Sequence, residues 1–351
     1  MAKLATAAEL PAEYLQALHE LQVAPLWPSL RGVLPYGPPP RQAAVAHWSY
    51  SAIRPLLIEA GQLTPIEKAE RRVLVMCNPG YGLDRLQATA TIYIGLQLIL
   101  PGEEAPNHRH SPSAIRMIIE GTGGYTSVEG EKLQMEAGDL ILTPSGLWHE
   151  HGHEGSDPVV WMDALDLPLV YYMDSSYAEE DALQHAPDLP DASQTRYRRS
   201  GLLPYNELRS QSPYPMMRFP WRDTRQALLE LSSARDGDEL VHLAYVNPLT
   251  GAECLPVLGC SAFMLRPGET ARLPRRTAST VLHIREGQGE GEIDGQTIGW
   301  NQHDIISAPP YVNTVMRNGS SQNPAFVFMV DDAPLQRCMK IYREFATGEE
   351  L

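Results

Sequence analysis

Histidines recur at alternating positions in two short stretches of this 351-residue chain. His108 and His110 form the first set, and His149, His151 and His153 form the second. Side chains two positions apart on a strand leave the same face, so each stretch can present imidazoles side by side. Imidazole is a ligand for Zn, Cu, Fe or Ni rather than for Mg or Ca. The pattern predicts a metal site on His108, His110 and His149.

The segment between the two stretches explains how they could meet. A turn at Glu129-Gly130 is followed by a returning strand, and His149 comes just after the P-S-G turn at 144–146. An antiparallel pairing would then bring His149 to the first two histidines. The alternative is a set of unrelated solvated or core histidines, and for His151 and His153 that purely structural role stays open.

Both stretches resemble the two-part motif of the cupin superfamily. The matching residues are Gly102, His108, His110 and Gly121 in the first half, and Gly138, Pro144, Gly146 and His149 in the second. Two positions depart from that motif. Ala114 stands where the superfamily usually carries a glutamate ligand, and His153 stands at the final Asn position. The expected centre therefore has three neutral ligands and no carboxylate.

A centre with three neutral ligands keeps the full charge of a divalent metal and favours an anionic, chelating substrate. Aromatic 2-hydroxy acids meet this demand through a carboxylate and an adjacent phenolate oxygen. Arg116 lies six residues past His110 with the same strand parity, so its guanidinium could hold the substrate carboxylate in a bidentate pair. The alternative for Arg116 is a surface charge.

Within the two-domain cupins the chain resembles the gentisate 1,2-dioxygenase family, which cleaves the ring of gentisate with O2 at ferrous iron to give maleylpyruvate. The resemblance spans most of the chain. It rests on P-L-W-P-S-L at 25–30, H-W-S-Y-S-A-I-R-P-L-L-I-E-A-G at 47–61, E-R-R-V-L-V at 70–75, G-L-Q-L-I-L-P-G-E at 95–103, H-R-H-S-P-S-A-I-R at 108–116, V-V-W-M-D-A-L-D at 159–166 and Y-V-N-P-L-T-G at 245–251.

The family resemblance implies a role for each site residue. It implies Fe(II) on the three histidines named above, with Arg116 binding the substrate carboxylate. His151 and Asp163 would act near the substrate hydroxyl in hydrogen bonding or proton transfer. Further substrate-binding residues would be Tyr93, Gly95, Gln97 and Arg72, although Arg71 and Arg85 compete for the role of Arg72. The resemblance further suggests a homotetramer.

Short runs of Val, Ile, Leu and Tyr between Gly and Pro turns predict a mainly β fold. Strands are expected at 72–76, 90–100, 113–120, 124–129, 139–143 and 159–165, and helices at 7–22, 50–60, 222–234 and 334–346. Residues 268–276 and 303–309 repeat the two motif halves with shifts of 166 and 165. The ligand positions of this repeat are Pro274, Arg276 and Thr314, none of which suits iron, and a structural role is expected for His283 and His303.

The fold class predicted is two cupin jelly-roll barrels in tandem with N-terminal, linker and C-terminal helices. The expected divisions are an N-terminal helical arm at 1–65, a metal-binding cupin domain at 66–170, a linker with a helix at 171–240, and a metal-free cupin domain with a C-terminal helix at 241–351.

The overall composition of the chain argues against some classes of binding partner. The net charge of -15 argues against binding to nucleic acid or to anionic membranes. No stretch reaches the length of a membrane-spanning helix, the N-terminus lacks the apolar core of a secretory signal, and four unclustered cysteines suit a reducing cytoplasm.

Rival functions stay open on sequence alone. Salicylate or 1-hydroxy-2-naphthoate could replace gentisate as the substrate, because the related ring-cleaving enzymes use the same three-histidine centre. A metal-dependent isomerase or a non-catalytic binding protein of the same fold is the alternative from another class. The sequence also leaves open the oligomeric state, the proton-transfer residue and the choice among Arg71, Arg72 and Arg85.

Overall fold

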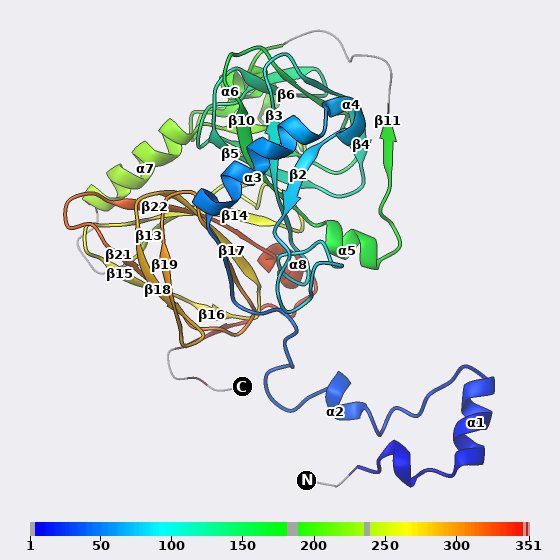
Figure 1. Ribbon diagram of the computed structural model, residues 1–351. Helices are drawn as coiled ribbons and strands as arrows, with labels where there is room; N and C mark the ends of the chain where they lie inside the picture. The colour runs from blue at the N-terminus through cyan, green and yellow to red at the C-terminus, as the bar shows by residue number, and fades with distance from the viewer. Residues whose placement is uncertain (1–3, 181–188, 235–238, 347–348, 350–351) are drawn as a thin grey trace. The chain divides into compact units, whose positions relative to one another are not determined.

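The computed structural model describes residues 4–180, 189–234, 239–346 and 349 (Figure 1). The chain separates into two units, one of residues 43–346 and one of residues 1–42 with 347–351. The smaller unit contains η1 (Ala7–Glu9), α1 (Ala12–Glu20) and α2 (Leu30–Val33), none of which buries a residue. The helix expected at 7–22 is therefore interrupted, because Pro11 stands at the N-cap of α1.

The larger unit holds two β modules, each built around two large sheets, and the second module has an additional two-stranded sheet. In the first module, the strands are β2 (Arg72–Val75), β3 (Tyr93–Ile99), β4 (Glu104–His110), β5 (Ala114–Glu120), β6 (Gly124–Val128), β7 (Glu131–Gln134), β8 (Leu140–Thr143), β9 (His149–His153), β10 (Val159–Leu165), β11 (Ala178–Glu180) and β12 (Arg218–Phe219). One sheet has the order β12-β8-β5-β10-β3-β2 and the other β11-β4-β9-β6-β7. All six strands expected from the sequence are present, with ends shifted by up to three residues.

The second module repeats this plan. Its strands are β1 (Ala46–Trp48), β13 (Val241–Ala244), β14 (Gly259–Leu265), β15 (Thr270–Leu273), β16 (Arg275–Arg276), β17 (Thr280–Glu286), β18 (Gly289–Ile293), β19 (Gln296–Trp300), β20 (Ile305–Ala308), β21 (Thr314–Asn318), β22 (Ala325–Asp331) and β23 (Glu344–Phe345). The sheet orders are β1-β20-β17-β22-β14-β13 and β15-β21-β18-β19, and β16 pairs with β23. The predicted mainly β fold with two repeats is confirmed.

The two modules share one hydrophobic core. Ile94 and Leu96 of β3 belong to the same buried cluster as Phe326 and Phe328 of β22. One face of each six-stranded sheet therefore packs toward the other module, while the opposite face lines the interior of its own module. Burial on both faces explains why β5 reads as the nearly continuous apolar run A-I-R-M-I-I-E. In that run the charged Arg116 is fully enclosed.

Helices connect and cover the modules. The predicted helix at 50–60 is α3 (Tyr50–Leu63), which lies along β2 and β3, and the predicted linker helix is α7 (Trp221–Ala234) (Figure 1). Shorter helices are α4 (Ile66–Ala69), α5 (Leu167–Tyr172), α6 (Ala192–Tyr197), η2 (Tyr205–Glu207) and α8 (Ala333–Cys338).

The C-terminal helix expected at 334–346 is present but shorter than predicted. Helix α8 ends at Cys338, and Lys340 adopts a φ of 61°, outside the helical region. Hydrogen bonds from the backbone N–H groups of Ile341 and Tyr342 to the carbonyl of Gln336 close this turn. The chain then continues as strand β23, which pairs with β16. The apolar spacing that predicted a helix belongs instead to a short helix, a turn and an edge strand.

Strand pairing also crosses the expected divisions of the chain. Strand β1 lies within the predicted arm at 1–65 but pairs with β20 of the second module. Strands β11 and β12 lie within the predicted linker at 171–240 and extend the two sheets of the first module. The division of the chain into four parts stays a prediction. Through these three strands, the predicted arm and linker each contribute to the sheets of a neighbouring module.

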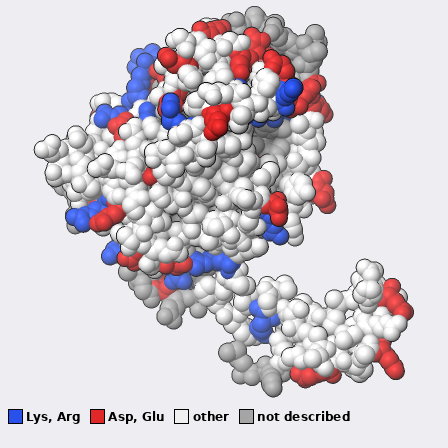
Figure 2. All heavy atoms as spheres, viewed as in Figure 1, with Lys and Arg blue, Asp and Glu red and all other residues white. Residues whose placement is uncertain are grey.

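Charges of both signs are distributed over the visible face of the molecule, between broad uncharged areas (Figure 2). Among the described residues, no helix has both the length and the apolar character needed to cross a membrane.

Candidate metal centre and substrate pocket

Three histidines converge inside the first module. Strands β4 and β9 pair antiparallel, with His108 opposite His149, and a bulge between Ala105 and His108 shifts the register. His110 follows at the end of β4. One ligand nitrogen from each of His108, His110 and His149 lies within 4.8 Å of the others. Within the described ranges this is the one group of three or more His, Cys, Asp or Glu side chains with metal-binding geometry.

The backbone fixes which nitrogen of each ring faces the centre. Nδ1 of His108 lies 2.8 Å from the carbonyl oxygen of Pro106, and Nδ1 of His110 lies 2.7 Å from that of Pro112. Nδ1 of His149 lies 2.9 Å from the carbonyl of Leu147. A carbonyl only accepts, so each Nδ1 carries the proton and donates, which leaves a lone pair on each Nε2. This is the arrangement that holds metal-binding imidazoles in one tautomer and orientation.

Burial keeps the three rings neutral. It lowers the pKa of His108 to about 3, with a further contribution from the positive charge of Arg71. The pKa of His110 is also lowered, mainly by burial, and that of His149 falls well below its ordinary value for the same reason and because His108 and His110 are adjacent. Neutral imidazoles do not have to lose a proton before they bind a metal. The chemistry of the donor set therefore fits a divalent transition metal.

Arg116 anchors a buried polar network beside the three histidines. Its Nε donates to Asp163 Oδ1 at 2.9 Å, and its Nη1 donates to Thr126 Oγ1 at 2.8 Å and to His151 Nδ1 at 2.9 Å. The second oxygen of Asp163 accepts from Trp161 Nε1 at 2.8 Å. The guanidinium carbon lies 4.9 Å from the centre of the Trp161 ring. Arg116 is thus a fixed cation in the interior, and the alternative of a surface charge is wrong.

His151 is held as a neutral hydrogen-bond donor. Its ring centre lies 5.9 Å from that of His108 and 5.6 Å from that of His149. Burial, followed by the charge of Arg116, lowers its pKa well below the ordinary value. Arg116 Nη1 lies 2.9 Å from Nδ1 and 3.3 Å from Nε2, and donation to the nearer Nδ1 leaves the proton of the neutral ring on Nε2. His151 can therefore donate a hydrogen bond to an oxygen near the metal centre, while the site disfavours its cationic form.

Tyr93, Gly95 and Gln97 line the same face as Asp163. Gly95 pairs with Asp163 across the sheet, and cross-strand partners share a face. A Cβ added at Gly95 would lie 2.6 Å from Tyr93 Oη and 2.5 Å from Val73 Cγ1, so a side chain there would force both neighbours to move. Burial, with the negative charge of Asp163 as the next cause, raises the pKa of Tyr93. The phenol group consequently stays protonated as a hydrogen-bond donor.

The expectation for Arg72 requires a correction. Its Nη1 donates to the carbonyl of Gly61 at 3.1 Å, and its Nη2 forms an ion pair with Glu103, away from the histidines. Of Arg71, Arg72 and Arg85, Arg71 is the one whose charge acts on both His108 and His110, in addition to Arg116. Burial lowers the pKa of Arg71, but a guanidinium stays charged in proteins. Arg71 and Arg116 thus place two guanidinium groups at the site, of which Arg116 is ion-paired with Asp163.

Strand alternation would have identified Arg71. Val73 pairs with Gln97 and Val75 pairs with Gly95, so both valines share the face of the expected pocket residues. Arg71 precedes β2 with the same parity, and Arg72 has the opposite parity. Thr126 and Trp161 are two further residues of the site that were not predicted from the sequence. Trp161 is opposite Gln97 in the register, and the same argument places it on the pocket face.

The second module holds no equivalent centre. Its counterparts of the three histidines are Pro274, Arg276 and Thr314, and the described residues contain no cluster of metal-binding side chains there. His283 and His303 stack with ring centres 5.9 Å apart. His283 lies in β17 of the six-stranded sheet, and His303 lies in the turn just before β20. A structural role was expected for both.

Comparison with known proteins agrees with this arrangement. Residues 95–165 match the cupin domain family. Over 335 residues the chain is 50% identical to gentisate 1,2-dioxygenase of a Ralstonia species, which covers 95% of this chain and 94% of that protein. It is 39% identical over 312 residues to 5-aminosalicylate 1,2-dioxygenase of a Comamonas species, covering 85% and 80% of the two chains.

The fold is also similar to a crystallised enzyme. Salicylate 1,2-dioxygenase from Pseudoaminobacter salicylatoxidans, solved as adducts with gentisate, superposes with a TM-score of 0.89 at 28% identity. The similarity covers 98% of both chains. The whole two-module plan is therefore shared with that enzyme, and not the first module alone.

Proposed function

Because the chain belongs to the gentisate 1,2-dioxygenase family of ring-cleaving enzymes, we propose that it opens gentisate with O2 to give maleylpyruvate. The observation that carries this proposal is the set of three inward-facing imidazole Nε2 atoms beside the buried Arg116 and the half-buried Arg71. We assign His108, His110 and His149 as ligands of Fe(II). Once bound, ferrous iron would supply coordination positions for the carboxylate and adjacent phenolate of the substrate and for O2, together with one-electron chemistry.

The protein itself binds and orients the substrate. Arg116 and Arg71 bind its carboxylate, and because Asp163 and Thr126 hold the Arg116 guanidinium, little side-chain freedom is lost on binding. The Nε2–H of His151 donates to a ring oxygen and stabilises the negative charge that develops there. Both oxygens of Asp163 are already hydrogen-bonded, so we assign it to positioning Arg116 and Trp161 rather than to proton transfer.

The pocket wall favours a flat ring. Gly95 leaves backbone where a side chain would otherwise fill the interior, and Tyr93 leans over it. Tyr93 and Gln97 line the path of the ring, with the phenol of Tyr93 as a hydrogen-bond donor to the substrate. These three residues complete the proposed substrate site.

The cellular context is part of the proposal. We place the enzyme in aromatic catabolism in the cytoplasm, as a homotetramer. In the unit of residues 1–42 and 347–351, the described helices bury no residue, and Leu26, Trp27 and Tyr36 are exposed. Contacts with a neighbouring subunit would cover such apolar side chains.

Oxygen uptake with a panel of substrates tests the proposed reaction. Iron-loaded protein should consume O2 with gentisate and produce a ring-opened product that absorbs in the near ultraviolet. We expect kcat/KM for gentisate to exceed that for salicylate or 1-hydroxy-2-naphthoate by about 10-fold or more, a difference of about 1.4 kcal/mol in transition-state binding. Binding of gentisate without O2 consumption would instead indicate a non-catalytic protein or an isomerase.

Salicylate is the second candidate substrate. The superposed salicylate 1,2-dioxygenase was solved with gentisate, so one scaffold of this kind accommodates both acids. Equal kcat/KM values for the two acids in the oxygen assay would favour a broad-specificity salicylate-type enzyme.

A matched pair of arginine variants tests whether Arg71, rather than Arg72, binds the substrate. Arg71→Gln should raise KM for gentisate by about 10- to 100-fold, because a hydrogen bond to a charged group contributes about 1.5–3 kcal/mol. Arg72→Gln removes the ion pair with Glu103 and should lower the thermal midpoint while KM stays near that of the wild type. Steady-state kinetics with melting curves distinguish the two, and the opposite pattern would restore Arg72 as the substrate-binding residue.

A further inference from the structure

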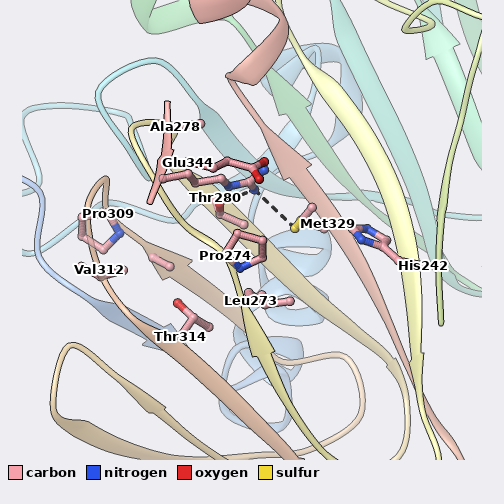
Figure 3. A pocket seen from close by; sticks show the side chains of 12 residues that line it. His242, Leu273, Pro274, Ala278, Thr280, Pro309, Val312, Thr314, Met329 and Glu344 are labelled. Carbon is pink, nitrogen blue, oxygen red and sulfur yellow. Dashed lines mark hydrogen bonds between the residues drawn. The ribbon is translucent and has the colours of Figure 1, made fainter. Parts of the chain in front are cut away.

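The second module contains a partly open cavity of about 140 Å³. Polar and apolar side chains both line it, among them Arg276, Thr280, Thr314, Met329, Leu273 and Ala308. Figure 3 shows Thr280, Met329 and Thr314 facing a shared space from different strands. Protein interiors rarely leave a void of this size unfilled.

The cavity occupies the place that the metal centre has in the first module. Arg276 stands 166 residues after His110, and Thr314 stands 165 residues after His149. Met329 corresponds in the same way to Asp163. The second module has thus replaced its metal ligands without filling the space between them, which is consistent with a retained binding site.

One guanidinium donor in the cavity has a poor partner. Arg276 Nη1 pairs with Asp331 at 2.9 Å, and Nη2 donates to Thr280 Oγ1 at 2.7 Å. Nη2 also contacts the Sδ atom of Met329 at 3.5 Å. A thioether sulfur is a weak acceptor, so a ligand oxygen placed there would make a stronger hydrogen bond.

The charges around the cavity select against an anion. Asp331 already neutralises Arg276, and Glu344 of β23 lines the cavity with a second carboxylate. His242, which also lines it, has a pKa lowered mainly by burial and then by the charge of Arg276, so it adds no positive charge near neutral pH. A ligand carboxylate entering the cavity would be the third one there and would face net negative charge.

We propose that the second module binds a neutral, single-ring molecule with one hydroxyl or carbonyl oxygen, seated in this cavity with that oxygen accepting from Arg276. Its volume is close to the roughly 150 Å³ of an engineered apolar cavity that holds benzene, so there is room for one six-membered ring. Leu273, Ala308 and Met329 contact the ring. This site is separate from the proposed ring-cleavage centre and does not depend on it.

Calorimetry with phenol as the probe tests the site on the full-length, metal-loaded protein without O2. Ala308→Leu adds three carbon atoms to the buried wall of the cavity, and Thr314→Ile is a second filling variant. Ala252→Leu adds the same atoms as the first variant at an exposed turn and is the matched control. We expect wild type and Ala252→Leu to bind one more phenol per chain than either filling variant, with gentisate turnover retained in all four proteins.

The structure of a phenol-soaked crystal locates the ligand. The phenol oxygen should lie within hydrogen-bond distance of Arg276 Nη2, and the calorimetric component lost in Ala308→Leu should be at least about 10-fold weaker for benzoate than for phenol. Equal phenol binding by folded wild type and both filling variants would overturn the proposal. Benzoate binding as tight as that of phenol in the lost component would overturn the selection for a neutral ligand.

Discussion

His149→Ala should yield a folded protein that has lost both its iron and its turnover. His149 lies opposite His108 on the paired strand, and its imidazole supplies one of three Nε2 ligands. Two neutral imidazoles alone hold Fe(II) poorly. Loss of a hydrogen-bond partner behind a metal ligand already costs about 10- to 100-fold in metal affinity or activity, and loss of the ligand itself should exceed that range. Iron analysis after anaerobic reconstitution, with oxygen uptake on the same sample, measures both effects.

His153 provides the matched control for that variant. It lies on the same strand and is also buried, but its Nε2 contacts the carbonyl of Asp157, and its Nδ1 accepts from the N–H of Gly155 at 2.8 Å. His153→Ala should keep full iron occupancy and measurable gentisate cleavage while lowering the thermal midpoint. Full iron in His149→Ala, or equal iron loss in both variants, would contradict the ligand assignment.

Arg116→Met should retain iron but lower kcat/KM for gentisate by about 100-fold or more. The change removes the buried cation that binds the substrate carboxylate, and truncation of one member of a buried, hydrogen-bonded charge pair typically costs 2–5 kcal/mol. It also leaves Asp163 without its ionic partner and His151 without the donor that fixes its tautomer. Both KM and kcat should therefore worsen, because binding and orientation are lost together. Steady-state kinetics at matched iron occupancy measure the effect.

The variant Arg285→Met is the control for Arg116→Met. It shows what the loss of a buried arginine outside the substrate pocket does. It is also largely buried, and its Nη2 donates to the carbonyl of Ala137, with the guanidinium over the Trp221 ring. Arg285→Met should destabilise the contact between the modules while KM for gentisate stays within about 3-fold of the wild type, a difference below 1 kcal/mol. If Arg116→Met changed only the melting temperature, Arg116 would be a structural residue and not a substrate ligand.

The sequence predicted the centre because its signal is local. Alternation places His108 and His110 on one face, and the turn before His149 fixes the return of the chain. The hydrogen bonds that orient the rings could not be predicted, because each accepting carbonyl is a backbone atom two residues away and carries no signature of its own. The interior location of Arg116 followed from strand parity, whereas its ties to Thr126 and Asp163 needed the register of three strands.

The predictions that differ from the structure share a physical cause. Pairing between strands distant in the sequence overrides the structure that the local residue pattern favours. The segment after Cys338 has the apolar spacing of a helix, yet its edge position beside β16 makes a strand the better use of its backbone groups. Strand β1 is only three residues long, and nothing in those residues reveals that their partner is β20, far along the chain. Arg71 and Arg72 are adjacent and chemically identical, so only the alternation of β2 distinguishes them.

Anomalous scattering at the iron edge, from crystals of anaerobically reconstituted protein, tests the central claim most directly. One strong peak should appear per chain, in the first module, bonded to the Nε2 atoms of His108, His110 and His149. No peak is expected among Pro274, Arg276 and Thr314 in the second module. A peak at any other group of side chains, or no peak in the first module of protein that cleaves gentisate, would contradict the account.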